Sequence, residues 1–337
     1  MNERLVVGVL GTELADLDPS SGGLEKLAAG WATELANHFQ VVPISMAHQA
    51  QVDPGAQPSS RELGEITRGC DLLVINNRPG WLTLTDHPAV LVLHNTSEAW
   101  GDFDREGIAS KRFSILTVSR WLSRHAQEVF DLSEPPPVID PFVDDEFLGA
   151  EWIGGDQIVF PNRLMAKKGV IETLQALDQL ADRDIRVTFI ENISPWESPT
   201  AEHRELIAAI QSDERCRLIP RIGEAKGLAR LIARSKGVIC PSTKPEGFGL
   251  APLEALAVGA PTLVSTNGGL GELVRLGAVQ VDPGDTRQFA KTLADLWRSP
   301  GSMRVNPRVS KQAIATRFQR QASTATLVAA LVELASR

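Results

Sequence analysis

The sequence predicts a protein of two doubly wound α/β domains, each built on a parallel β-sheet with helices on both faces. The chain has 337 residues, which suits two domains of about 150 residues better than one. Short runs rich in Val, Ile and Leu alternate with longer amphipathic stretches, and the short runs are apolar throughout. Such runs are typical of parallel strands that helices cover on both faces. A proline-rich segment divides this alternation into two halves.

The first half alternates from its beginning. We expect strands at Leu5–Leu10, Val41–Ser45, Cys70–Asn76, Ala89–His94 and Phe113–Ser119, and helices at Leu24–His38 and Arg120–Phe130. Residues 51–69 are expected to form a loop. The segment Asp131–Asp145 holds four prolines, which exclude a regular helix and a central strand. We therefore expect this segment to be the linker between the domains.

The alternation then starts again. We expect strands at Gln157–Pro161, Ile185–Ile190, Cys216–Pro220, Gly237–Cys240 and Pro261–Ser265. We expect helices at Gly169–Leu180, His203–Ser212, Gly223–Ser235 and Leu250–Val258, and a last amphipathic helix from Pro307 to Ala335. Residues 195–202 are expected to form a loop. In open α/β sheets ligands collect at the carboxyl ends of the strands, so we look for a site there.

Composition excludes several functions. The net charge of −8 and the pI near 5.4 leave no global basic field for nucleic acid or anionic membrane. Three scattered cysteines without metal-ligand spacing indicate reduced thiols and a cytoplasmic location. The N-terminus carries no signal-peptide pattern, and no apolar run reaches the roughly 20 residues that span a bilayer. We expect no bound metal and no transmembrane segment; the oligomeric state stays open.

The segment Pro241–Val264, PSTKPEGFGLAPLEALAVGAPTLV, carries the clearest chemistry. A strand is followed by a glycine-containing loop and then by a helix that has Pro252 in its first turn, where proline is tolerated. The N-terminus of such a helix is a phosphate site. Glu246 and Glu254 flank the turn, and because carboxylates repel phosphate, we expect them to face the hydroxyls on either side of a diphosphate.

This segment resembles the retaining GT-B glycosyltransferases of family 4, whose signature is Glu-x7-Glu. The resemblance implies two Rossmann-like domains whose parallel sheets face each other across a cleft. Residues 1–145 would form the acceptor-side domain, with a C-terminal helix at about 318–337 packing back on it, and residues 146–317 the nucleotide-sugar domain. The first carboxylate, Glu246, would contact the donor sugar, and the second, Glu254, the ribose. The remaining donor contacts implied here are Gly247, Phe248, Gly249 and Leu250.

Further motifs extend the resemblance. Asn162-Arg163 and Lys168-Gly169 are similar to the family's Gly-Arg-x4-Lys-Gly motif, which implies that Arg163 and Lys168 grip the diphosphate, although Lys167 sits beside Lys168. An Arg fork and a Lys charge can stabilise a leaving diphosphate without a metal. The other implied site residues are Gly22 and Gly23 beside the donor, His94 near the transferred sugar, and Arg221 and Ile222 at the base. Trp100 and Asp102 are acceptor candidates by position alone.

The function implied is transfer of a sugar from a nucleoside-diphosphate sugar to a hydroxyl acceptor with retention of anomeric configuration. Glu246, His94, Arg163 and Lys168 would form the catalytic group. No cofactor is expected beyond the donor, which would carry UDP or GDP; the acceptor would be a small molecule, a glycan or a lipid-linked acceptor. Two alternatives stay open, a sugar-nucleotide epimerase of similar fold and a non-catalytic subunit that binds sugar nucleotides. A dehydrogenase is disfavoured, because Gly8-Val9-Leu10-Gly11 lacks the third glycine of the dinucleotide fingerprint.

Overall fold

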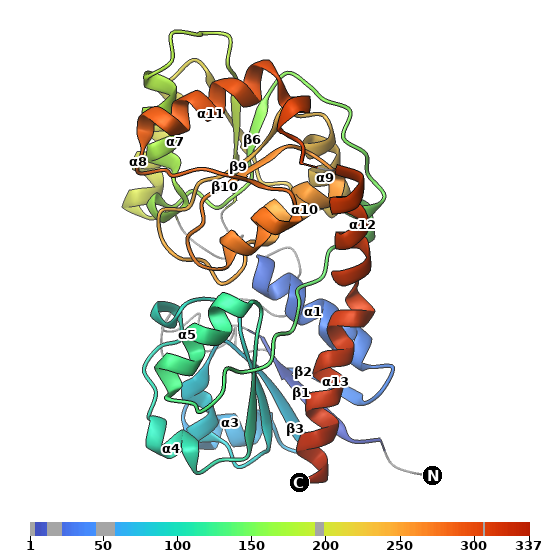
Figure 1. Ribbon diagram of the computed structural model, residues 1–337. Coiled ribbons are helices and arrows are strands. Elements are labelled where there is room, and N and C mark those ends of the chain that lie inside the picture. Colours follow the sequence, from blue (N-terminus) through green and yellow to red (C-terminus); the bar gives the residue numbers. More distant parts are fainter. Residues whose placement is uncertain (1–3, 12–21, 45–57, 193–198, 306) are drawn as a thin grey trace. The chain divides into compact units, whose positions relative to one another are not determined.

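The computed structural model describes residues 4–11, 22–44, 58–192, 199–305 and 307–337. The chain divides into two compact units, residues 1–142 with 320–337, and residues 143–319. The sequence analysis placed its domain boundaries at residues 145 and 317. Each unit is a parallel α/β domain (Figure 1). The predicted fold class of two Rossmann-like domains is confirmed.

The first unit holds a five-stranded parallel sheet in the order β2-β1-β3-β4-β5. The strands are β1 (Val6–Leu10), β2 (Gln40–Ile44), β3 (Leu72–Asn76), β4 (Ala89–Leu93) and β5 (Phe113–Thr117). All residues of β3 and β4 are buried, which explains why these runs are apolar except for Asn76 at the end of β3. The strand order reverses between β1 and β3, so the carboxyl ends of these two strands mark the place where such sheets bind ligands.

Helices cover both faces of this sheet. Helix α1 (Gly23–Leu35) contacts the C-terminal helix α13 (Arg320–Ser336), which also contacts β4 and β5. Helices α4 (Arg105–Ala109) and α5 (Arg120–Phe130) lie on the opposite side of the strands (Figure 1). The Trp31 indole of α1 donates a hydrogen bond to Ser323 of α13 over 2.8 Å. The last helix is thereby part of the first unit, although it lies at the far end of the sequence.

One expectation for this half of the chain was wrong, and another needs refinement. Residues 51–69 were expected to be a loop, but Ser60–Ile66 form helix α3, which Ser59 and Glu62 begin with a reciprocal capping box. The segment Asp131–Asp145 is not a free linker along its whole length. The Ile139 N–H donates to the Thr117 carbonyl over 2.9 Å, so this part of the segment lies against the edge strand β5.

The second unit holds a six-stranded parallel sheet in the order β11-β10-β9-β6-β7-β8. The strands are β6 (Ile158–Phe160), β7 (Val187–Glu191), β8 (Cys216–Pro220), β9 (Gly237–Cys240), β10 (Thr262–Val264) and β11 (Val279–Gln280). The order runs outward in both directions from β6, as in dinucleotide-binding folds. The switch point therefore lies between the neighbouring strands β6 and β9.

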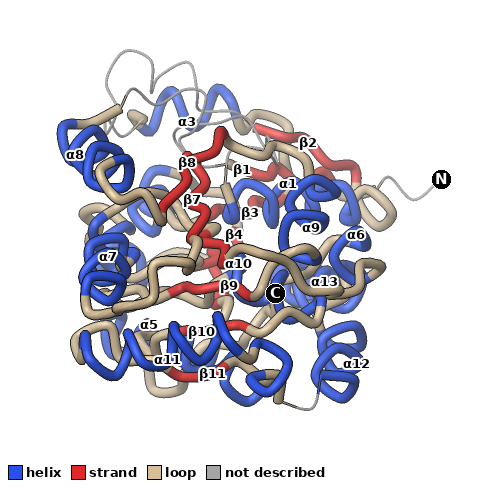
Figure 2. The backbone as a smooth tube through the Cα atoms, turned by 90° about the horizontal axis from the view of Figure 1, so that it is seen from above, coloured by secondary structure: helices blue, strands red, loops and turns tan. Residues whose placement is uncertain are grey.

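The helices of the second unit form two layers. One contains α7 (Val170–Asp178), α8 (Ala201–Gln211) and α11 (Thr286–Arg298); the other contains α6 (Asp145–Leu148), α9 (Ala225–Ala233), α10 (Leu250–Val258) and α12 (Pro307–Arg317). Figure 2 shows α7 and α8 on one side of the strands, with α9 and α6 on the other. Helix α11 was not predicted. The single helix expected from Pro307 to Ala335 is instead two helices, α12 and α13, because the residues Phe318 and Gln319 between them are not helical.

Candidate functional site

Two loops meet at the switch point of the second sheet. One follows β6 and carries Arg163 and Lys168; the other follows β9 and carries Glu246. The Thr243 N–H donates to the Lys167 carbonyl over 2.9 Å and joins the loops directly. At Gly169, whose φ is +83°, a Cβ atom would lie 2.0 Å from the Pro241 carbonyl oxygen. Only glycine permits so close an approach of the two backbones.

A cation and a carboxylate from these loops form an ion pair. The Lys168 Nζ lies 2.9 Å from the Glu246 Oε2, and the two side chains are 20% and 16% exposed. The other carboxylate oxygen of Glu246 accepts a hydrogen bond from the Ser242 hydroxyl. Lys167 is exposed, so Lys168 is the lysine of this pair that reaches Glu246. The structure thus brings together two residues that the sequence analysis assigned to the diphosphate and the sugar.

The Glu246 loop is fixed by a third loop, which follows β10. The Ser242 carbonyl accepts hydrogen bonds from Ser265 Oγ and Asn267 Nδ2, each over 2.7 Å. The Gly269 N–H donates to the Glu246 carbonyl over 2.7 Å. These contacts hold Glu246 from both its side chain and its backbone. The sequence analysis gave no role to Ser242 or Asn267. The one signal for Ser242 in the sequence is its place at the start of the segment Pro241–Val264.

Helix α10 begins directly after the Glu246 loop. Gly249 precedes it in the left-handed region, with φ +106°, and Gly259 ends it with φ +82°; its bounds, Leu250–Val258, are those that the sequence predicted. The first N–H groups of a helix have no partner within it, so this end favours an anion. It follows β9 at the same edge of the sheet as Lys168. The unit therefore places a lysine and a helix N-terminus at the same edge of the sheet.

Glu254 and Phe248 are both buried. The Glu254 side chain on α10 is 5% exposed. Burial raises the pKa of the Cys240 thiol at the end of β9, and the charges of Glu246 and Glu254 raise it further, while Lys168 acts in the opposite direction. These charges thus surround one strand end. The Phe248 ring packs against Phe318 with 5.8 Å between ring centroids, so a donor contact at this position would fall to its backbone.

The remaining predicted residues of the second unit lie at two strand ends. Arg163 lies in the loop that follows β6 and is half-buried. Arg221 and Ile222 are half-buried and follow β8 at the edge of the sheet, where β7 separates them from β6. Gly247 is buried, and Leu250 is the first residue of α10. Their predicted contacts with a donor stay predictions.

His94 in the first unit is buried and neutral. Its Nε2 lies 2.9 Å from the Asn76 Oδ1, and the Asn76 Nδ2 donates to the Leu10 carbonyl. Because this orients the amide, Nε2 carries the proton, and the buried Nδ1 is an acceptor that has no hydrogen-bond partner among the residues that the structure describes. Burial lowers the pKa of His94 to about 3. The centroids of the His94 and Trp31 rings lie 5.5 Å apart. In this neutral state His94 can accept a hydrogen bond at Nδ1 and cannot act as an acid.

Other predicted residues of the first unit lie in different places. Gly22 and Gly23 begin helix α1, while the adjoining residues Ser20 and Ser21 lie outside the described residues. Trp100 is fully buried, and its indole donates to the Asn95 carbonyl over 2.8 Å. It is a core residue, so its choice as an acceptor contact was wrong. Asp102 is exposed.

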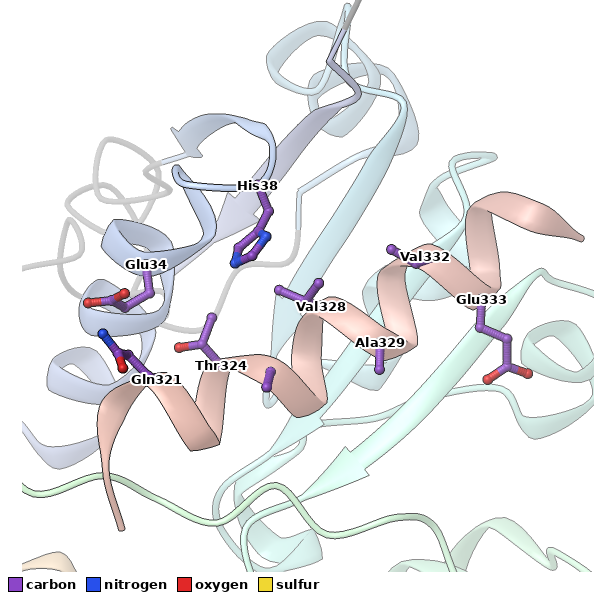
Figure 3. Close-up of a pocket in the computed structure, with 9 residues that line it drawn as sticks. Glu34, His38, Gln321, Thr324, Val328, Ala329, Val332 and Glu333 are labelled. Carbon is purple, nitrogen blue, oxygen red and sulfur yellow. The ribbon is translucent and has the colours of Figure 1, made fainter. Parts of the chain in front are cut away.

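A cavity of about 510 Å³ also lies in the first unit, between α1 and α13 (Figure 3). Its lining residues are Glu34, His38, Gln321, Thr324, Ala325, Val328, Ala329, Val332 and Glu333. Helix α1 begins at Gly23, whereas Glu34 lies at its other end and His38 lies just beyond that end. The cavity therefore contains none of the residues predicted to bind the donor.

Comparisons with known proteins agree with this fold. Residues 154–314 match the family described as glycosyl transferases group 1. The glycogen synthase of Mycobacterium tuberculosis is 24% identical over 298 residues, which cover 81% of this chain and 69% of that protein. The D-inositol 3-phosphate glycosyltransferase of Corynebacterium efficiens is 31% identical over 148 residues, 41% of this chain and 34% of that protein.

Solved structures resemble the whole chain in fold. The sucrose-phosphate synthase of Thermosynechococcus elongatus superposes with a TM-score of 0.76 at 15% identity, covering 98% of this chain and 99% of that chain. HepE of Anabaena, in complex with UDP and glucose, gives a TM-score of 0.68 at 16% identity, covering 98% and 100%.

Two parallel sheets of these strand orders, together with the likeness to these solved structures, give the chain a GT-B fold. Residues 154–314, just under half of the chain, match the glycosyl transferases group 1 family, and this match supports a glycosyltransferase. Among the described residues, no helix combines the length and the apolar character that crossing a membrane requires.

Proposed function

We propose that this glycosyltransferase takes its sugar from a nucleoside-diphosphate sugar and transfers it to a hydroxyl acceptor with retention of anomeric configuration. The observation that carries the proposal is the pairing of Lys168 with Glu246 over 2.9 Å beside the N-terminus of α10. A phosphate and a sugar hydroxyl from one ligand would replace each partner of this pair. UDP or GDP is the proposed nucleotide, and complexes of HepE with UDP and glucose support UDP.

In this proposal Arg163, Lys168 and the helix N-terminus hold the diphosphate, so that a metal is not required. They stabilise the charge that develops on the departing phosphate. Glu246 accepts hydrogen bonds from sugar hydroxyls, and Glu254 binds the ribose. The bond between the anomeric carbon and the phosphate oxygen breaks, the acceptor oxygen attacks from the same face, and the departing phosphate takes the acceptor proton. The roles of His94, Gly22 and Gly23 near the sugar, and of Arg221 and Ile222 near the base, stay predictions.

Nucleotide binding is the first test. A ligand that binds only the folded protein raises its stability in proportion to affinity, so melting temperatures are measured with UDP, GDP, ADP and TDP and then with their sugars. We expect one diphosphate to stabilise the protein in the presence of EDTA. A requirement for a divalent cation would refute the metal-independent part of the proposal. Arg163→Ala should weaken this binding at least about tenfold, equivalent to about 1.4 kcal/mol, and near-normal binding and activity would refute its diphosphate role.

Product analysis separates the proposed reaction from the two alternatives. Transfer releases the nucleoside diphosphate and forms a glycosylated acceptor, and NMR of the new linkage reports whether the anomeric configuration is retained. An altered sugar nucleotide without released diphosphate would indicate an epimerase. Binding without transfer or hydrolysis, across a panel of sugars and acceptors, would indicate a non-catalytic subunit.

A further inference from the structure

The loop between Arg163 and Lys168 is held from outside the donor site by the first turn of α8. The backbone N–H of Ala166 donates to the Glu202 Oε1 over 2.9 Å. The next residue of α8, His203, places its Nδ1 3.3 Å from the Leu164 carbonyl oxygen. A carbonyl can only accept, so this nitrogen carries the proton. Two consecutive side chains of α8 thus contact the backbone between the two proposed diphosphate ligands.

The contacts of α8 depend on residues that fix its first turn. The Thr200 hydroxyl caps the helix by accepting from the His203 N–H over 3.1 Å. His203 is 8% exposed, and its Nε2 lies 3.8 Å from the Glu191 carboxylate at the end of β7. The following residue, Asn192, donates its Nδ2 to the Pro161 carbonyl over 2.6 Å. The β6 loop is therefore supported from its start at Pro161 as far as Ala166.

Glu202 accepts a hydrogen bond from the first N–H group of the turn in this loop, as a capping residue does at the start of a helix. Ala166–Lys168 form a single 3-10 turn, and Met165 before it supplies no side-chain cap. The first N–H groups of such a turn need an acceptor, and the Glu202 carboxylate supplies one from another helix. Lys168 is the last residue of this turn. The position of its ammonium group thus depends on how the turn is anchored.

We propose that Glu202 and His203 are positioning residues that hold the loop of Arg163 and Lys168 in the geometry required for a diphosphate. This inference rests on the proposed function, because it assumes that these two side chains bind the diphosphate. Glu202 acts through the loop backbone and touches no ligand. Its effect is accordingly confined to the phosphates of the donor and does not extend to the nucleoside.

Three variants test the role of Glu202, which is exposed and so can be replaced without opening the core. Glu202→Ala removes the acceptor and the charge. Glu202→Gln removes the same charge from the first turn of α8 but keeps an oxygen for the Ala166 N–H. Glu205→Ala, at another exposed position of α8, controls for the loss of a surface carboxylate. The comparison of Ala with Gln isolates the hydrogen bond from the interaction of the charge with the helix dipole.

The measurement is the affinity for a nucleoside diphosphate and for its monophosphate, by calorimetry with UDP and UMP or with GDP and GMP. We expect Glu202→Ala to weaken diphosphate binding about tenfold, equivalent to about 1.4 kcal/mol, while monophosphate binding changes less than about twofold. Glu202→Gln and Glu205→Ala should resemble the wild type. Recovery by Gln would show that the acceptor oxygen matters.

Two results would overturn the inference while the proposed function stands. One is diphosphate binding by Glu202→Ala equal to that of Glu205→Ala. The other is an equal loss of diphosphate and monophosphate binding with a lowered melting temperature, which would show a structural role alone. If the wild-type protein binds none of these nucleotides, the proposed function fails, and the inference fails with it.

Discussion

The ion pair between Lys168 and Glu246 predicts that Glu246→Gln strengthens the binding of a free nucleoside diphosphate while it abolishes turnover. In the unliganded protein the carboxylate competes with a phosphate for the same ammonium group. Gln has the same length, and its Oε1 can still accept from Ser242, but it cannot neutralise Lys168. Replacing Glu246 therefore leaves the lysine available to the diphosphate. The sugar, by contrast, loses the carboxylate that would accept from its hydroxyls.

The geometry sets the size of this effect. The Lys168 and Glu246 side chains lie 2.9 Å apart and are 20% and 16% exposed. Exposed ion pairs contribute about 0–1 kcal/mol, and hydrogen bonds to charged groups contribute about 1.5–3 kcal/mol. This partly buried pair falls between the two ranges. We expect a gain of about 1.4 kcal/mol, equivalent to about tenfold tighter binding of the diphosphate.

Calorimetry with the stabilising nucleotide, alongside an assay of diphosphate release from the sugar nucleotide, measures both effects. Glu254→Ala is the matched control, because the other carboxylate of the motif is assigned to the ribose. Its loss should weaken the binding of the diphosphate. Unchanged or weaker diphosphate binding by Glu246→Gln would refute the competition between carboxylate and phosphate, and unchanged binding by Glu254→Ala would refute the ribose role.

Two further predictions concern the surroundings of the site and the first unit. At Gly268, whose φ is +72°, a Cβ atom would lie 2.3 Å from the Glu246 carbonyl oxygen, so Gly268→Ala should displace the Glu246 loop. This substitution should lower the free energy of unfolding by about 1–3 kcal/mol and reduce turnover. Gly271→Ala is the control and should change neither, because a Cβ atom there would lie no closer than 3.5 Å to a neighbouring atom. Equal effects of the two substitutions in denaturation and activity assays would contradict this account. Because burial lowers the pKa of His94 from 6.5 to about 3, the unfolded chain binds a proton that the folded protein excludes. Stability should fall by about 1.4 kcal/mol per pH unit below 6.5, and His94→Asn should remove this component in urea titrations at pH 7.5 and 5.5; an identical pH dependence would exclude a buried neutral imidazole.

The sequence predicted an element correctly where its hydrophobic pattern and the residues at its two ends indicate the same bounds. Helix α5 and helix α10 begin and end at the predicted residues, the latter because Gly249 and Gly259 mark both ends. Helix α3 was missed although Ser59 and Glu62 form a capping-box pattern that is readable in the sequence. The break between α12 and α13 has a tertiary cause that periodicity does not record. Phe318 is fully buried, packs on Phe248 and accepts a hydrogen bond from the Val143 N–H.

The candidate site was predicted through motifs, whereas its supports depend on strand order. Periodicity gives the strands but not their neighbours, so the adjacency of β6 to β9 on one side and β7 on the other could not be predicted from it. That order determines which loops meet. From the β9 side, Glu246 reaches Lys168 with the acidic group proposed to bind the sugar. From the β7 side, Asn192 and Glu202 reach the backbone of the same loop. Because β6 lies between β9 and β7, its loop contacts Glu246 from the β9 side and is held by Asn192 and Glu202 from the β7 side. The residues that only hold the loop belong to no sequence motif.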